Sequence, residues 1–238
     1  MDNSGNNGWD NNQWNDQNQW DNGYQQGPQP VQRQPVFYNG ILNRPLLKQE
    51  SKEIFRANYG NSLAATILPS IIAGGISMIP IVGGFISWFF SPILFVGGYF
   101  LILELVRGYQ QARAGDIFNV FDDFGNVFGA MFMTNLFIGL WSLLLVIPGI
   151  YKAFSWAMVQ YILADNPKMS GTEARALSEQ MMDGHKMEYF VLLLSFLGWE
   201  LLGACTFGIL DLFYVNPWLG VTIGDYYDNL RMLYEARQ

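Results

Sequence analysis

A single carboxylate, Glu200, lies deep inside an apolar stretch of this sequence, where a charge is costly. It follows Tyr189 by 11 residues, about 16 Å along a helix, which is close to the middle of a membrane-sized segment. A carboxylate at that depth must be neutral, paired or open to a wet cavity. Two roles stay open for Glu200: a proton or cation relay in a transporter, or a protonated acid that hydrogen-bonds a neighbouring helix.

Lys152 and Asp211 complete the candidate intramembrane polar site. They stand 59 positions apart, an offset that also relates Gly139 to Gly198, so they occupy corresponding positions of two sequence repeats. Both fall at the predicted outer ends of apolar segments. An ion pair between them and two independently solvated side chains are both compatible with the sequence.

Three further residues, His185, Lys186 and Arg175, are candidate contacts to lipid headgroups, because they belong to the helix-like stretch Ser170–Lys186 expected along the headgroups and can carry positive charge. A single histidine cannot build a multi-histidine metal site. Cys205, the only cysteine, cannot form an internal disulfide and stands in an apolar stretch, which is typical of an inert thiol.

The remaining charges near segment ends receive simple assignments. Glu104 and Arg107, three positions apart, predict a local pair at a helix end. Asp165 and Asp225 close two apolar segments at nearly matching positions, which predicts that both lie in the headgroup zone.

No catalytic signature stands out elsewhere. The chain shows no serine nucleophile elbow, no phosphate-binding glycine loop and no paired carboxylates in a cytoplasmic domain. We therefore expect no enzymatic activity, no cofactor and no metal. The net charge of −7, without a basic stripe interleaved with aromatics, argues against a nucleic-acid partner.

The distribution of charge indicates membrane helices. Residues 57–103 contain no charged side chain over 47 positions, and residues 124–151 contain none over 28. A hydrocarbon core about 30 Å thick needs roughly 20 apolar residues in a helix, so the first gap fits two spans and the second fits one. The sequence predicts an all-α, polytopic protein of the cytoplasmic membrane with six apolar segments: Leu63–Met78, Phe85–Leu105, Val127–Ile147, Ile150–Leu163, Tyr189–Leu210 and Leu212–Tyr226. The fourth and sixth are short, so re-entrant half-helices stay open there.

The basic residues predict the orientation. Of 13 lysines and arginines, 12 fall on one side of these segments, and only Lys152 falls on the other. Because basic residues are retained on the cytoplasmic side, both termini are expected in the cytoplasm.

The six segments form three hairpins that resemble one another. Gly60, Gly125 and Gly184 each stand at the entry to an odd-numbered segment, and each is followed 24 positions later by another glycine. Helix-like stretches with one apolar face precede the hairpins. The clearest are Asp116 to Phe128, with Asp116 as a candidate N-cap, and Ser170 to Lys186, where Ser170 and Glu173 have capping-box spacing. We expect these to be interfacial amphipathic helices along the cytoplasmic headgroups.

Residues 1–35 have a different composition from the helical membrane domain, 36–238. Asparagine and glutamine dominate, with Trp9, Trp14 and Trp20 at near-regular spacing, and few aliphatic residues are present. Such a segment cannot form a core, which predicts a disordered cytoplasmic tail. An inert tail and a segment for self-association or partner capture are both possible.

Several stretches resemble one bacterial membrane-protein family. They are residues 146–150 (VIPGI), Tyr161–Pro167 (YILADNP), Leu194–Trp199 (LSFLGW), and a set between Ala174 and Lys186 that includes Leu177, Met181 and His185. From about Asn39 to Asn229 the chain resembles the family catalogued as domain of unknown function 975. This resemblance implies an all-helical protein of the cytoplasmic membrane, mainly of Gram-positive bacteria, without an established activity. The asparagine- and tryptophan-rich tail departs from the family pattern.

From these observations we expect a non-enzymatic integral membrane protein that organises membrane lipids or partner proteins. The alternative is a small-solute or lipid transporter with Glu200 at its centre.

Overall fold

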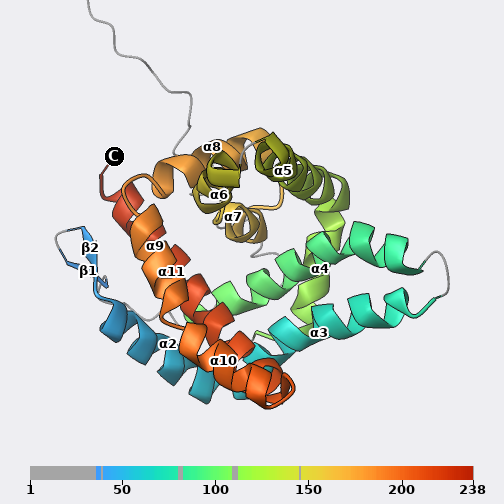
Figure 1. The fold of residues 1–238 in the computed structure, drawn as a ribbon, viewed down its shortest axis with the longest axis horizontal. Helices are drawn as coiled ribbons and strands as arrows, with labels where there is room; N and C mark the ends of the chain where they lie inside the picture. Colours follow the sequence, from blue (N-terminus) through green and yellow to red (C-terminus); the bar gives the residue numbers. More distant parts are fainter. Residues whose placement is uncertain (1–35, 39, 80–82, 109–111, 145, 238) are drawn as a thin grey trace, which may run out of the picture.

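The computed structural model describes residues 36–38, 40–79, 83–108, 112–144 and 146–237. These form an all-helical protein, which confirms the predicted fold class (Figure 1). The helices in chain order are α2 (Arg44–Ala57), α3 (Tyr59–Ser77), α4 (Gly83–Val106), η2 (Ala114–Asp123), α5 (Phe124–Leu144), α6 (Val146–Ser155), α7 (Val159–Asp165), α8 (Gly171–Met181), α9 (Lys186–Leu194), α10 (Leu197–Cys205), η3 (Asp211–Val215) and α11 (Asn216–Glu235). A short antiparallel ladder of β1 (Phe37–Tyr38) and β2 (Ile41–Leu42) precedes them. The predicted tail, residues 1–35, lies outside the described residues.

Among the described residues, three helical stretches are long and apolar enough to cross a membrane. They are Tyr59–Ser77, Ala114–Leu143 and Lys186–Cys205, and they contain most of the first, third and fifth predicted segments. The second segment lies in α4, where Phe90–Val106 is a shorter apolar helix. The fourth is divided between α6 and α7, and the sixth begins as the π-helical turn η3 before α11. The chain therefore has the helices of a membrane protein, but its helices do not match six uninterrupted spans.

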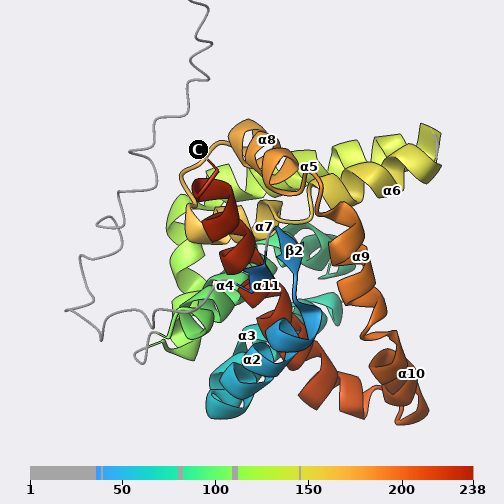
Figure 2. The ribbon, with the colours of Figure 1, turned by 90° about the vertical axis from the view of Figure 1, so that its left-hand side faces the viewer.

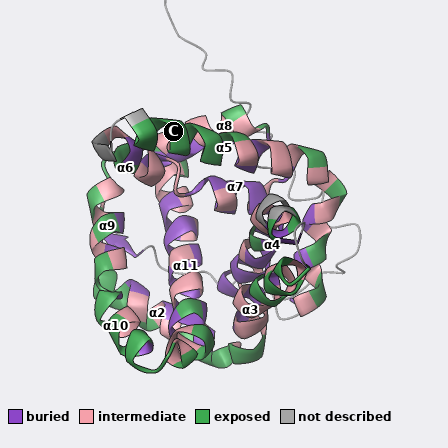
Figure 3. Ribbon diagram, turned by 45° about the vertical axis from the view of Figure 1, so that its right-hand side comes forward, coloured by how far each residue is buried: buried purple, intermediate pink, exposed green. Residues whose placement is uncertain are grey.

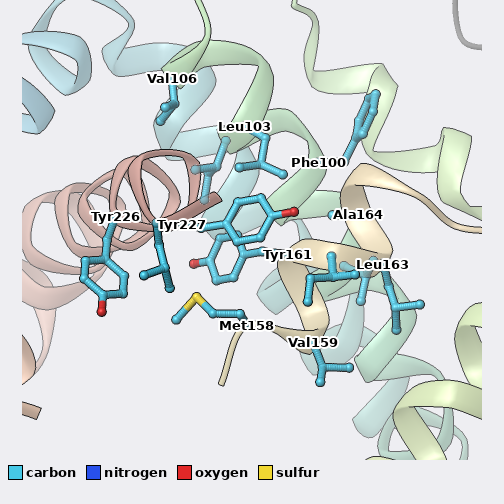
Figure 4. Close-up of a cluster of buried hydrophobic side chains, with 14 of the residues drawn as sticks. Phe100, Leu103, Val106, Met158, Val159, Tyr161, Leu163, Ala164, Tyr226 and Tyr227 are labelled. Carbon is cyan, nitrogen blue, oxygen red and sulfur yellow. The ribbon is translucent and has the colours of Figure 1, made fainter. Parts of the chain in front are cut away.

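The core forms around the short helix α7, whose apolar residues are almost all buried. Tyr161 of α7 stacks on Tyr227 of α11, with ring centroids 5.7 Å apart. Leu103 and Val106 at the end of α4 close this cluster (Figure 4). The apolar second half of α4 and the buried face of α11 thus enclose α7.

Close packing within the first hairpin depends on Gly98. A Cβ atom at this position would lie 2.3 Å from the carbonyl oxygen of Ala65, so any other residue would force α4 away from α3.

The first long helix, α2, packs antiparallel against the last, α11. Asn43 caps α2 by accepting a hydrogen bond from the amide of Leu46 at 3.3 Å. The hydroxyls of Ser51 and Thr222 lie 2.9 Å apart, and farther along α11 Asn229 accepts a hydrogen bond from the amide of Val36 at 3.0 Å. The N-terminal segment of the described chain is therefore fastened along the C-terminal helix.

The hairpins expose apolar side chains at their turns. The α5–α6 arm and α10 extend away from the rest of the molecule in Figure 2, and exposed residues concentrate on such arms in Figure 3, whereas α7 and α11 are largely buried. Three side chains are the most exposed large apolar ones: Phe207 (97 %), Met78 (86 %) and Leu143 (86 %). Each lies at or beside the turn of a different hairpin.

Both predicted amphipathic stretches are helical, although η2 begins before Asp116 and α8 ends at Met181 rather than at Lys186. Ser170 caps α8 and forms the predicted capping box with Glu173, whose backbone amide lies 3.3 Å from the Ser170 hydroxyl. Asp116 is not an N-cap: η2 begins at Ala114, and the Asp116 carboxylate accepts from the amide of Arg113 at 2.6 Å. The capping carboxylate therefore acts from the third helical position, and η2 leads directly into α5.

Candidate functional site

The carboxylate of Asp165, which is only 10 % exposed, joins the ends of three helices. Asp165, the last residue of α7, accepts hydrogen bonds from Arg107 at 2.5 and 3.1 Å and from Arg231 at 2.5 Å. The hydroxyl of Tyr227 donates to the same carboxylate at 3.2 Å, and Arg107 also donates to Asp228 at 2.9 Å. We call these five residues the Asp165 cluster.

The Asp165 cluster keeps its central carboxylate ionised. Burial alone would raise the pKa of Asp165, but the guanidinium groups of Arg107 and Arg231 outweigh it and hold the pKa at about 2. A carboxylate with that pKa neither donates nor accepts protons near neutral pH. The cluster therefore holds α4, α7 and α11 together through charge-assisted and bidentate hydrogen bonds.

Lys152 and Asp211, predicted as a possible ion pair, are not paired. The Lys152 ammonium instead forms a salt bridge with Glu179 of α8. The predicted correspondence between repeats fails here because α6 ends at Ser155 and packs beside α8, where the hydroxyl of Ser178 donates to the Ser155 carbonyl at 2.8 Å.

Glu200 and Asp211 lie on adjoining elements, α10 and η3, close enough for their carboxylates to repel each other. The Asp211 carboxylate packs against Gly203, since a Cβ atom there would meet Asp211 Oδ1 at 1.5 Å. That oxygen is buried and has no hydrogen-bond partner among the described residues. Glu200 stands five residues before Cys205, the end of the apolar stretch Lys186–Cys205, and so lies about halfway between the middle of that stretch and its end.

His185 is directed into the protein. It is 4 % exposed, and its ring packs edge-on against Phe37 with centroids 5.3 Å apart. Its Nδ1 lies 2.9 Å from a carboxylate oxygen of Glu188. The imidazole thus has protein partners in the position where the sequence suggested a lipid headgroup.

Lys186 and Arg175 lie against the second hairpin. The Lys186 ammonium stands 4.9 Å from the ring centroid of Tyr151, and the Arg175 guanidinium stands 5.5 Å from that of Phe137. Arg175 also donates to the hydroxyl of Thr134 at 3.3 Å. Their contact with headgroups stays a prediction.

Within the described part of the chain, no group of three or more histidine, cysteine, aspartate or glutamate side chains could hold a metal ion.

The C-terminal part of the chain carries a family signature. Residues 142–234 match the model of a family described as "Protein of unknown function (DUF975)". The resemblance predicted from the sequence is thereby confirmed over these residues, and between Asn39 and residue 141 it stays a prediction. No curated protein and no solved structure matches the chain.

The DUF975 match includes α7, α8 and α11, so it holds Asp165, Tyr227, Asp228 and Arg231, whereas Arg107 lies before it. Sequence reasoning missed the Asp165 cluster. It paired Arg107 with Glu104 and placed Asp165 among headgroups, because helical spacing reveals only neighbours on one helix. Asp225, also placed there, is fully buried and receives a hydrogen bond from Asn229 at 3.2 Å. The sequence feature that could have indicated the cluster is the position of Asp165 within the YILADNP stretch that carries the resemblance.

Proposed function

We propose that this chain is a non-enzymatic integral membrane protein that organises lipids or partner proteins at the cytoplasmic membrane. In this proposal three hairpins enter the bilayer from the cytoplasmic side, and both termini stay in the cytoplasm. The hairpins are α3 with α4, α5 with α6, and α10 with η3 and the beginning of α11.

One observation carries the proposal: the most exposed large apolar side chains lie at the hairpin turns. Exposure of Phe207, Met78 and Leu143 to water is unfavourable, whereas the hydrocarbon of a bilayer would remove these apolar side chains from water. The Asp165 cluster lies at the opposite end of α4 from the turn of the first hairpin. Apolar tips and an ionic base are what a hairpin inserted from an aqueous surface requires.

The basic residues support the same orientation. Lys152 is the single exception to the predicted asymmetry, and its partner Glu179 belongs to α8, which the sequence places at the cytoplasmic surface. With Lys152 beside α8, the exception no longer opposes a cytoplasmic location of both termini.

Helix lengths bear on how deeply each hairpin reaches. Crossing about 30 Å of hydrocarbon takes roughly 20 helical residues. Alone, α6 has 10 residues and α10 has 9. The finer proposal of six full crossings therefore needs α7 and α9 to continue these helices through the membrane.

Thiol labelling tests the proposal, because Cys205 is the only native cysteine. In a Cys205→Ala background we expect a cysteine at Arg237 to resist an impermeant reagent in intact cells and to react after permeabilisation. Labelling of that position in intact cells would contradict the proposal. Cysteines at Met78, Leu143 and Phe207 extend the test, because only complete crossings expose all three turns to the outside.

A transporter is the second candidate, favoured by the two carboxylates Glu200 and Asp211 on an apolar hairpin. A bound cation would relieve their repulsion and satisfy the unpartnered oxygen of Asp211.

A further inference from the structure

Two lysines of α2 converge on one tryptophan of α11. The ammonium of Lys48 lies 5.3 Å from the centroid of the Trp218 ring, and that of Lys52 lies 5.2 Å from it. Lys48 also stands 4.1 Å from the centroid of Phe196 and donates to the carbonyl and hydroxyl of Ser195 at 3.3 and 3.2 Å. Lys48 is therefore held at the turn between α9 and α10, and both cations lie beside Trp218.

This pair of positive charges has no carboxylate within salt-bridge distance among the described residues. Burial lowers the pKa of Lys48, and the charge of Lys52 lowers it further. The indole N–H of Trp218 is buried and also has no acceptor in the described chain. Positive charge thus collects at this place without a paired carboxylate from the described part of the chain.

The residues around the lysines are those typical of a membrane interface. Phe196, Trp199, Tyr214 and Trp218 form a contiguous aromatic cluster, with the Phe196 and Trp218 centroids 4.8 Å apart and those of Trp199 and Trp218 5.8 Å apart. Tryptophan and tyrosine concentrate at headgroup level, where one end of the ring is apolar and the other is wet.

A polar and an apolar surface of the protein lie on the two sides of this cluster. The outer face of α2 exposes polar side chains, including Arg44, Gln49 and Glu53. On the other side, α10 and η3 expose Leu197, Leu201 and Phe213. The lysine pair belongs to the polar helix and contacts the aromatic rings beside the apolar elements, an arrangement that suits a phosphate at a membrane surface.

We propose that Lys48 and Lys52 bind the phosphate of an anionic phospholipid whose acyl chains lie along α10 and η3. This inference rests on the proposed function, because it requires the third hairpin to enter a bilayer. Lys48 and Lys52 supply charge, and the aromatic cluster fixes the depth of the headgroup.

The test compares lipid binding by two double variants of the full chain in detergent. Lys48→Gln with Lys52→Gln removes the site, and Arg44→Gln with Arg56→Gln removes the same charge from exposed positions of the same helix. The measurement is the shift in thermal unfolding midpoint as phosphatidylglycerol or phosphatidylcholine is titrated into the micelles. Lys52→Gln alone provides a milder variant, because Lys52 makes no hydrogen bond in the structure.

We expect phosphatidylglycerol to stabilise the wild type and the arginine variant. Each lysine near an anionic surface contributes roughly five-fold to affinity, so the lysine double variant should bind about thirty-fold more weakly. Lys52→Gln should show about a five-fold loss on the same scale.

Three results would overturn the inference: equal responses of the two double variants, an equal response to phosphatidylcholine, or an equal response to inorganic phosphate at matched concentration. The last would assign the site to free phosphate. Membrane fractionation of the wild type separates the two proposals, since a chain recovered in the soluble fraction would contradict the proposed function itself.

Discussion

Arg107 donates two hydrogen bonds to Asp165 from 58 positions away in the chain, with the shorter at 2.5 Å. Arg107 directly follows α4 and Asp165 ends α7, so one planar guanidinium fixes the C-terminal ends of these two helices relative to each other. The same carboxylate receives Arg231 from α11. Three elements that share no sequence pattern are thereby held at a single point.

Replacing Asp165 by asparagine should destabilise the protein strongly. The change leaves two largely buried arginines without their shared counter-charge, and such a loss costs about 3–5 kcal/mol in fully buried pairs. Glu235→Gln is the matched control, because it removes the exposed partner of the same Arg231 and should cost less than about 1 kcal/mol. Thermal unfolding in detergent measures both, and equal effects would show that the Asp165 cluster does not fasten the helices.

Stability should also fall in acid. The pKa of Asp165 is depressed from 3.8 to about 2, so its contribution is complete above pH 4 and is lost as the pH falls through 2. The shift corresponds to about 2 kcal/mol. Protonation of Asp165 lowers the stability of the wild type between pH 4 and pH 2. In the Asp165→Asn variant this part of the pH-dependent loss of stability should be absent. An unchanged pH profile in the variant would remove Asp165 as its cause.

A double-mutant cycle should find coupling between Lys152 and Glu179 and none between Lys152 and Asp211. Both side chains of the observed pair are partly exposed, so the coupling should be about 0.2–1 kcal/mol. The comparison uses Lys152→Gln with Glu179→Gln and with Asp211→Asn. A larger coupling to Asp211 would restore the pairing expected from the sequence repeat.

Gly203→Ala should destabilise the third hairpin by about 1–3 kcal/mol, because the new methyl group would collide with the Asp211 carboxylate. Gly198→Ala is the control on the same helix: no atom lies within 4 Å of its added Cβ, so alanine should be neutral or stabilising. Unfolding midpoints of the two variants give the answer. If both variants behaved alike, the close approach of Asp211 to Gly203 would be in doubt.

Glu200→Gln separates the two candidate functions. Glutamine keeps a donor and an acceptor at similar size, and interhelical hydrogen bonds of this kind are worth about 0.6 kcal/mol, so a protein that organises lipids or partners should be almost unaffected. A relay must take up and release a proton, which glutamine cannot do. Growth or ion flux is measured beside thermal stability. A folded but inactive variant would favour the transporter.

Local features of the fold could be predicted from the sequence, whereas its long-range pairs could not. The capping box of Ser170 and Glu173 depends on four consecutive residues, and the charge-free stretches reveal apolar helices directly. The Asp165 cluster depends on how α4, α7 and α11 meet, which helical periodicity does not encode. The turn between α9 and α10 was missed for a related reason: Ser195 and Phe196 continue the apolar pattern across it, and no proline or charge marks the break.

The antiparallel pairing of α2 with α11 has a consequence for biosynthesis. Ser51 leaves the ribosome 171 residues before its partner Thr222, an interval of about 10–30 s at ordinary rates of translation. During this time the apolar stripe of Leu47 and Phe55 has no α11 to cover it. The nascent chain must therefore carry an uncovered amphipathic helix until its last helix emerges.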